Sequence, residues 1–141
     1  MVNKIAGFRL GKYFMASVNA LLVEDNDFFR ESFKKILNDR FPAMNIIEAE
    51  NGKEALNRYR EFSPDLVFID INLPDRNGFE ISKIIRSEPS RCVIFFLTSY
   101  DLPEYRQAAF NHGANFFFSK DCKPEEIFAA LESVTVAQGV S

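Results

Sequence analysis

The feature that most constrains the fold of this chain is a fivefold alternation of short apolar runs with helix-like patterns. The runs lie at residues 20–23, 45–47, 66–69, 92–97 and 116–118. Apolar residues at helical spacing follow them, around residues 29–41, 55–59, 79–85, 105–110 and 124–134. Five β-α units predict a parallel sheet with helices on both faces, and the third and fourth runs are continuously apolar, as doubly buried strands are.

Connection rules narrow this α/β fold further. Right-handed crossovers leave few topologies, and we predict a flavodoxin-like (βα)5 doubly wound parallel sheet of strand order 2-1-3-4-5. Asn51-Gly52 has the composition of a hairpin turn, but residues 53–56 beyond it have a helical pattern, so the hairpin is rejected. A length of 141 residues favours one domain.

Composition limits the partners that the chain can have. With 17 Lys and Arg against 20 Asp and Glu, the formal net charge is −3 at pH 7, so we expect no direct nucleic-acid binding. No apolar run approaches the roughly 18–20 residues of a membrane span. The 16 Phe residues are expected to fill the core. Cys92 and Cys122 lack metal-type or redox-type spacing and fit a reducing cytoplasm.

A basic segment precedes the first predicted strand. Residues 1–16 contain Lys4, Arg9 and Lys12 and no acidic residue, and their apolar stretch is too short for a signal-peptide core. We interpret them as an extension from an upstream start or as non-native residues. The more specific functional alternative is a basic helix that associates with a membrane. The predicted organisation is an extension over 1–16, one domain over 17–136 and a short tail over 137–141.

Polar side chains follow four of the five predicted strands where each strand ends. In chain order they are Glu24 and Asp25, Asp70, Thr98, and Lys120. The second strand ends near Glu48 and offers nothing comparable. In a doubly wound sheet the ligand site lies outside the carboxyl ends of the strands, near the point where the strand order reverses. Because strands one and three are neighbours, the first three carboxylates should converge.

Three converging carboxylates repel one another unless a cation is present. Hard oxygen ligands with room for water favour Mg²⁺ over Zn²⁺. Thr98 and Lys120 beyond Asp70 complete a cradle for a tetrahedral oxyanion, which makes Asp70 the candidate nucleophile in phosphoryl transfer. Each of these residues, taken alone, has an ordinary structural interpretation. Thr98 would be a hydroxyl at a strand end, Lys120 a solvated side chain, and the acidic residues helix caps. We expect Asp27 to be such a cap.

These residues resemble those of response-regulator receiver domains of two-component signalling, which have the chemotaxis-regulator fold. The resemblance covers about residues 17–134, and its motifs lie at 21–25, 65–78, 96–99 and 113–120. The acidic pair is Glu-Asp rather than Asp-Asp, a tolerable variation. Asp121 stands where many relatives have Pro, as in the subgroup with helix-turn-helix output domains, although the sequence ends at Ser141 without room for one.

The resemblance implies a role for each acidic residue. Asp70 is expected to accept the phosphoryl group. Asp25, Asp70 and the backbone carbonyl of Asn72 are expected to ligate Mg²⁺, and Glu24 is expected to act through a metal-bound water.

The same resemblance makes Thr98 and Lys120 the contacts of the phosphoryl oxygens and places Phe117 where the family has its switch aromatic. Strand alternation puts Phe117 and Lys120 on opposite faces, so Phe117 would respond through Thr98. A two-state ring would remodel the surface of the fourth helix, fifth strand and fifth helix, the expected docking or homodimer face. Alternatively, Phe117 is one more core residue.

The resulting hypothesis is a phosphorylation-activated signalling switch rather than a classical enzyme. Its partner is a sensor histidine kinase or phosphotransfer protein, with small acyl phosphates as substitute donors. His112 lacks the surroundings of a phosphodonor and is expected at the surface.

A phosphatase of the haloacid-dehalogenase type would need a general acid where Asn72 stands. An FMN-binding flavodoxin would need a phosphate-binding loop where residues 24–27 are acidic. An unphosphorylated pseudo-receiver, acting only as an interaction module, remains the alternative.

Overall fold

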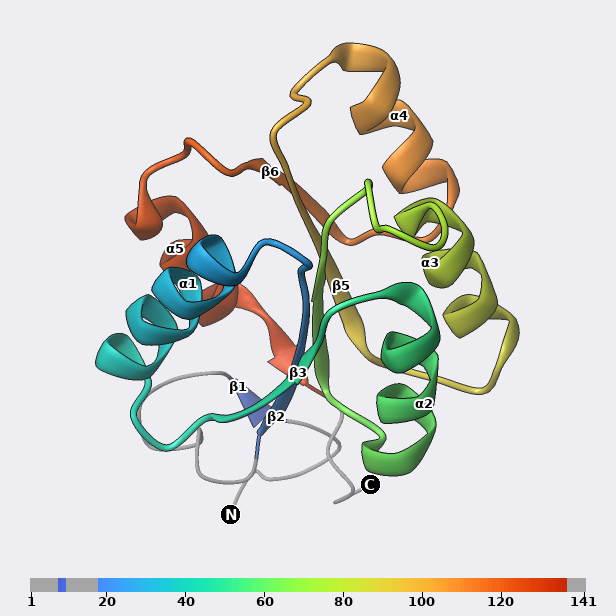
Figure 1. Cartoon of the computed structure of the whole chain (residues 1–141). Coiled ribbons are helices and arrows are strands. Elements are labelled where there is room, and N and C mark those ends of the chain that lie inside the picture. Colours follow the sequence, from blue (N-terminus) through green and yellow to red (C-terminus); the bar gives the residue numbers. More distant parts are fainter. Residues whose placement is uncertain (1–7, 10–17, 137–141) are drawn as a thin grey trace.

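A five-stranded parallel sheet in the order β3-β2-β4-β5-β6 lies at the centre of the protein (Figure 1). The structure is a computed structural model that describes residues 8–9 and 18–136. The strands of the sheet are β2 (Asn19–Val23), β3 (Asn45–Ala49), β4 (Leu66–Ile69), β5 (Val93–Thr98) and β6 (Phe116–Ser119). Counted as the five predicted strands, this order is 2-1-3-4-5, so the flavodoxin-like prediction is confirmed.

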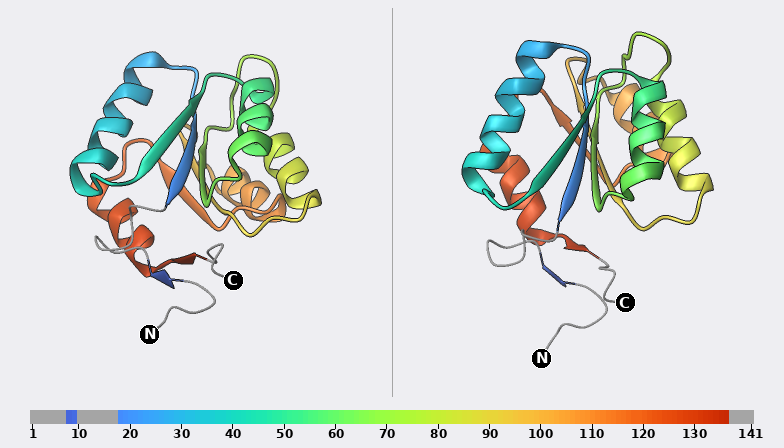
Figure 2. Two further views of the ribbon diagram at one scale, coloured as in Figure 1. Left: turned by 90° about the horizontal axis from the view of Figure 1, so that it is seen from below. Right: turned by 60° about the horizontal axis from the view of Figure 1, so that its bottom comes forward.

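Helices alternate with these strands and cover both faces of the sheet. They are α1 (Asp27–Arg40), α2 (Gly52–Phe62), α3 (Gly78–Ser87), α4 (Pro103–Asn111) and α5 (Pro124–Ser133). Helices α1 and α5 lie on one face, and α2, α3 and α4 lie on the other (Figure 2). None of the helices between residues 18 and 136 has the length and apolarity that a membrane crossing requires.

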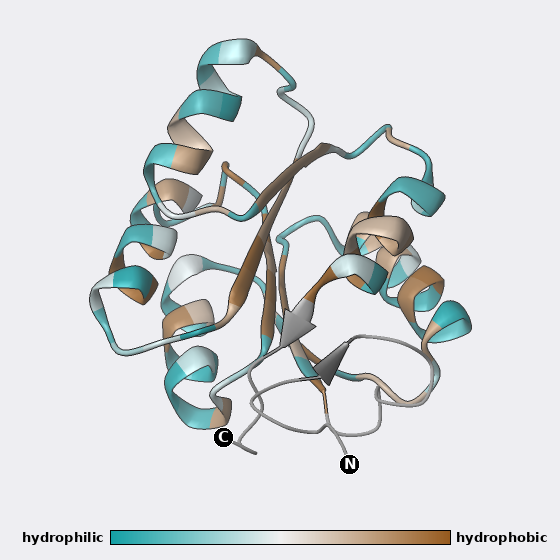
Figure 3. Cartoon of the chain, turned by 180° about the vertical axis from the view of Figure 1, so that it is seen from behind, coloured by the Kyte–Doolittle hydropathy of each residue, from teal (hydrophilic) through white to brown (hydrophobic). Residues whose placement is uncertain are grey.

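The strands carry the apolar core on both faces, and they are the most hydrophobic part of the ribbon (Figure 3). Every residue of β4 is buried, which explains its uninterrupted apolar run. Phenylalanine rings form a chain of contacts on the α1 and α5 side, made of Phe29, Phe33, Phe68, Phe95, Phe116 and Phe118. Phe28 is 82% exposed, so the expectation that the Phe residues fill the core does not hold for every Phe residue.

The helix starts confirm one expectation and correct another. Asn51 caps α2 by accepting a hydrogen bond from the Glu54 amide, so residues 51–52 do open a helix and not a hairpin. The expectation that Asp27 caps α1 is wrong. Asn26 has the extended backbone of a cap and accepts from the Phe29 amide, while Asp27 is already helical.

A small antiparallel pair lies outside the main sheet and was not predicted. β1 (Phe8–Arg9) pairs with β7 (Thr135–Val136). Figure 1 shows it at the amino ends of the parallel strands, away from the expected site. The rest of the predicted extension, residues 1–7 and 10–16, and the predicted tail, residues 137–141, lie outside the described residues. Cys92 and Cys122 are both free thiols.

Candidate functional site

Three carboxylates meet at the carboxyl end of the sheet, as the sequence predicts. Glu24 and Asp25 follow β2, and Asp70 follows β4; the two strands are hydrogen-bonded in register, with Val23 opposite Ile69. One carboxylate oxygen from each acid lies within 4.8 Å of the others. Glu24 and Asp70 are buried, whereas Asp25 is exposed. The acidic cluster is therefore open to solvent through Asp25.

The buried acids are held by short hydrogen bonds from the backbone. The Asn26 amide donates to Glu24 Oε2 at 2.9 Å, and the Ile71 amide donates to Asp70 Oδ1 at 2.7 Å. Burial raises the pKa of the Glu24 carboxyl, although hydrogen bonds from Lys120 and Asn26 oppose the rise. All the donor atoms are carboxylate oxygens, so the cluster fits a hard divalent cation such as Mg²⁺.

Lys120 follows β6 and joins the two buried acids. Its Nζ lies 2.7 Å from Glu24 Oε1 and 3.0 Å from Asp70 Oδ2, and it also lies 4.6 Å from the centre of the Phe29 ring. Burial tends to lower the pKa of the Lys120 ammonium, but the bonds to Glu24 and Asp70 outweigh this effect and raise it. Lys120 is therefore a charged ammonium placed beside Asp70.

Thr98 ends β5 and is fully buried. Its Oγ1 accepts a hydrogen bond from the Tyr100 amide at 3.0 Å, and its backbone carbonyl accepts from the Lys120 amide at 2.8 Å. Among the side-chain hydrogen bonds of the described residues, none joins Thr98 to Asp70. In this structure the Thr98 hydroxyl oxygen is thus bonded to the backbone of its own loop rather than to the acidic cluster.

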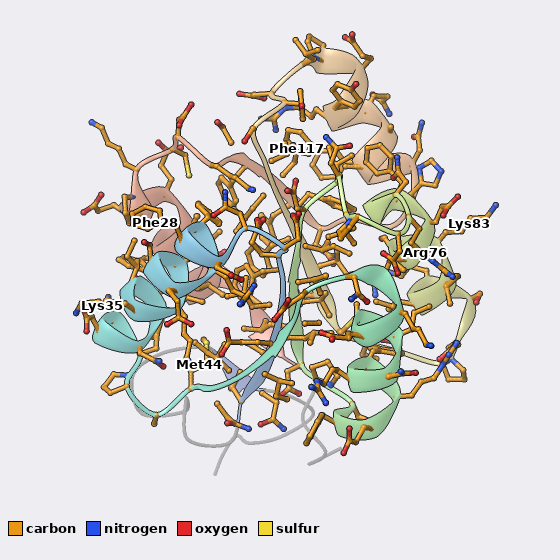
Figure 4. All side chains as sticks on the ribbon, in the orientation of Figure 1. Phe28, Lys35, Met44, Arg76, Lys83 and Phe117 are labelled. Atoms are coloured by element: carbon orange, nitrogen blue, oxygen red, sulfur yellow. The ribbon has the colours of Figure 1, made fainter. Side chains whose placement is uncertain are left out.

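Phe117 lies on the face of β6 opposite to that of Phe116 and Phe118. Its ring is 3% exposed and belongs to the core under α2, α3 and α4, on the α4 side of the sheet in Figure 4. The Arg106 guanidinium of α4 covers it, 4.9 Å from the ring centre. The ring is therefore buried here, and the predicted separation from Lys120 by strand alternation agrees with these contacts.

The β4–α3 loop and the first residue of α3 contain two residues whose roles the sequence did not predict, Asp75 and Gly78. The Gly78 amide donates to the Ile71 carbonyl at 2.6 Å, and a Cβ at Gly78 would lie 2.1 Å from the Asp70 carbonyl oxygen. Asp75 accepts hydrogen bonds from the Gly52 and Lys53 amides at the start of α2. Neither contact has a local sequence signal. The Asp75 contacts join segments that are distant in the sequence, and the Gly78 contact depends on the loop folding back on itself. A third missed residue is Arg30, whose guanidinium contacts the Glu24 carbonyl.

The burial of His112 differs from the expectation that it lies at the surface. It is half-buried at the end of α4, where its ring stacks on Phe79 at 5.4 Å and its Nδ1 lies 2.6 Å from the Ala108 carbonyl oxygen. Its ring is thus part of the contact between α3 and α4 and is not a free surface group.

A match to a known family identifies the fold. The family model for the response regulator receiver domain matches residues 20–132. The chain belongs to this family. Receiver domains of the CheY and NarL type are signalling modules rather than classical enzymes, and receiver domains generally bind Mg²⁺ at an acidic pocket. In this chain the acidic cluster is formed by Glu24, Asp25 and Asp70.

Relatives of different lengths share this receiver domain. The chemotaxis protein CheY of Halobacterium salinarum is 34% identical over 117 residues, which are 83% of this chain and 96% of that protein. The nitrate/nitrite response regulator NarL of Escherichia coli is 28% identical over 123 residues, which are 85% of this chain and 56% of that protein. The chain therefore spans nearly the whole of one relative and about half the length of others, including the sensory transduction protein LytT of Oceanobacillus iheyensis at 48%.

Solved structures agree with the receiver fold. The chemotaxis response regulator CheY4 of Vibrio cholerae has a TM-score of 0.74 at 27% identity, covering 82% of this chain and 97% of its own. A LuxR-family response regulator from Aurantimonas has a TM-score of 0.76 at 30% identity, covering 83% and 84%.

Proposed function

We propose that this receiver domain is a switch operated by phosphorylation of Asp70. The observation that carries the proposal is the position of the Asp70 carboxylate at the tip of β4, within 4.8 Å of the other acids and 3.0 Å from Lys120 Nζ. A sensor histidine kinase or a phosphotransfer protein supplies the phosphoryl group, and small acyl phosphates substitute for it. The unit that accepts it is residues 17–136.

The transfer forms one bond and breaks one. An Asp70 carboxylate oxygen attacks the donor phosphorus, and the bond from phosphorus to the donor's nitrogen or oxygen breaks, leaving an acyl phosphate on Asp70. Lys120 offsets the charge of the incoming oxygens, and the Thr98 hydroxyl donates to one of them. Later attack by water slowly returns the carboxylate and inorganic phosphate.

Mg²⁺ fits the same cluster and supplies charge neutralisation to the phosphoryl oxygens. Asp25, Asp70 and the backbone carbonyl of Asn72 would hold it directly, and Glu24 would act through a water. The all-oxygen donor set and the access to solvent through Asp25 support this assignment.

The signal leaves through Thr98 and Phe117. When Thr98 turns toward a phosphoryl oxygen it gives up its contact with the Tyr100 amide, and the Phe117 ring changes its packing under Arg106. The surface of α4, β6 and α5 is then remodelled and binds the output partner or a second copy of the chain.

The test is incubation with Mg²⁺ and acetyl phosphate, followed by intact mass spectrometry. The parent should gain one phosphoryl group, Asp70→Asn should gain none, and Asp25→Ala should need more Mg²⁺. Asp75→Asn is the matched control, because Asp75 lies in the neighbouring loop and bonds to α2 instead; it should react as the parent does.

Two outcomes would contradict the proposal. Modification of Asp70→Asn to the level of the parent would move the acceptor elsewhere. A parent that takes up no phosphoryl group from acetyl phosphate or from a phosphorylated partner would favour the alternative, an interaction module that is never phosphorylated.

A further inference from the structure

Arg30 is a buried cation that contacts the backbone of the acidic cluster, at the Glu24 carbonyl. Among the described residues it is the one Lys or Arg that is buried, with 8% of its surface exposed. It belongs to the first turns of α1, whose other basic side chains lie nearer to solvent. A buried charge is stable only where its donors are paired, so the partners of Arg30 indicate what it does.

Each nitrogen of the Arg30 guanidinium has a partner in a different part of the chain. Nε donates to Glu48 Oε1 in β3 at 2.9 Å, and Nη2 donates to Asp27 Oδ1 at the start of α1 at 2.9 Å. Nη1 donates to the backbone carbonyl oxygen of Glu24 at 2.8 Å, in a buried hydrogen bond. Arg30 thus joins β3 and α1 to the end of β2.

The Glu24 carbonyl belongs to the peptide group that connects Glu24 to Asp25. Because a peptide group is planar, turning it changes how the two flanking side chains face each other. The Glu24 amide is already fixed to the Ala49 carbonyl at 3.0 Å, and the Glu24 carboxylate to the Asn26 amide. The bond from Arg30 fixes the carbonyl between the two acids.

The charge of Arg30 is balanced within its own cluster. Glu48 and Asp27 accept its hydrogen bonds, Glu50 Oε2 lies 3.7 Å from its Nη2, and Lys34 Nζ binds Glu48 at 2.9 Å. Three carboxylates therefore face two cations. Arg30 meets the acidic pair through the Glu24 backbone, so its effect on that pair is geometric.

We propose that Arg30 is a positioning residue, which sets the orientation of the Glu24–Asp25 peptide and thereby the spacing of the acidic pair around a divalent cation. This inference rests on the proposed function, because the cation is the Mg²⁺ assigned to that cluster. Arg30 does not touch the cation or the phosphoryl group; it acts through the Glu24 carbonyl.

The test measures Mg²⁺ affinity by isothermal titration calorimetry in the absence of a phosphodonor. Arg30→Met removes the hydrogen bond to the Glu24 carbonyl, and we expect the affinity to fall about 10-fold to 100-fold, as for other residues that orient metal ligands. Lys34→Met is the matched control, since it removes the other cation on Glu48 and leaves the Glu24 carbonyl bonded. It should bind Mg²⁺ as the parent does.

Urea unfolding without metal separates this role from a merely structural one. If both Met variants lose Mg²⁺ affinity in proportion to their lost stability, or if Arg30→Met binds as the parent does, the positioning role is overturned. If Arg30→Met does not fold, Glu48→Ala decides, because it removes the oxygen that accepts the hydrogen bond from Arg30 Nε. An intermediate loss of affinity supports the role, and parent affinity overturns it. A parent that binds no Mg²⁺ overturns the proposed metal site itself, before any variant is compared.

Discussion

Behind the Asp70 carboxylate, the backbone is packed so closely that only a glycine fits opposite it. The Gly78 amide bonds to the Ile71 carbonyl, and this brings the start of α3 against the Asp70 carbonyl. The contact fixes the direction in which Asp70 leaves β4. Its neighbours are backbone atoms, which cannot rotate away as a side chain can.

Gly78→Ala should therefore be costly. A Cβ at this position would lie 2.1 Å from the Asp70 carbonyl oxygen, so α3 or the Asp70 backbone must shift. We expect a loss of about 3 kcal/mol in the free energy of unfolding, measured with urea, together with slower phosphorylation. Gly52→Ala is the control. Its new Cβ meets the side chain of exposed Arg76, which can move, and the tip of the Ile81 side chain at 3.0 Å, but no backbone atom, so a loss of about 1 kcal/mol is expected. Equal losses in the two variants would refute the argument.

The residues of the site differ in how far the sequence could predict them. The convergence of Glu24, Asp25, Asp70 and Lys120 was predictable, because parallel strand order alone brings the ends of their strands together. The roles of Arg30, Asp75 and Gly78 were not, because each depends on a contact between segments that are not adjacent strands. The direction of the Thr98 hydroxyl was also beyond the sequence, since it depends on the local path of the chain toward Tyr100.

Among the elements, the buried strands and the helices that follow them were predictable from apolar periodicity. β4 and β5 are buried almost throughout, so their composition has little freedom. The pair of β1 and β7 was not predictable, because two residues in each strand carry no periodicity. The start of α1 was missed by one residue, since Asn26 and Asp27 are both good caps and only the backbone conformation distinguishes them.

The attachment of α1 to β3 depends on ionised Glu48. Its carboxylate accepts hydrogen bonds from Lys34 and Arg30. Partial burial tends to raise the pKa of the Glu48 carboxyl, but these two bonds outweigh it and lower the pKa below its ordinary value. A lowered pKa in the folded state means that the ionised form contributes stability above the ordinary pKa of about 4.3. This contribution is lost as the pH falls through the lower, folded-state pKa.

We therefore expect Glu48→Gln to reduce the free energy of unfolding at pH 7 by about 1 kcal/mol relative to the parent. The difference between the two proteins should shrink as the pH falls from about 5 to 3, because the parent then also loses its ionised carboxyl. Urea unfolding across this range measures it. Asp39→Asn is the control, since Asp39 forms an exposed pair with Lys35 within α1 and should have little effect at either pH. A difference that grows on acidification would have the wrong sign.

At the scale of the whole molecule, the sheet lies between Lys120 with its Phe29 contact on one face and the Phe117 ring on the other. The carboxylates and Lys120 lie at its carboxyl end. Lys120 contacts the Phe29 ring, which packs against the core under α1 and α5. Phe117 lies in the core on the opposite face, under Arg106 of α4. The β5–β6 ladder, where Thr98 pairs with Ser119 and Phe96 pairs with Phe117, offers a path for a signal from Asp70 to α4.

Phe117→Ala tests whether this ladder carries the signal. We expect the variant to be phosphorylated by acetyl phosphate, because the ring touches neither the carboxylates nor Lys120, and to lose about 3 kcal/mol of stability. In the parent, hydrogen exchange over α4 should change when Asp70 is phosphorylated; in Phe117→Ala this change should be absent. Phe116→Ala is the matched control, because Phe116 is the preceding residue of β6 but packs on the α1 and α5 face, and its response in α4 should be kept. If α4 responds fully in Phe117→Ala, the ring is a core residue only, and the signal takes another path across the sheet.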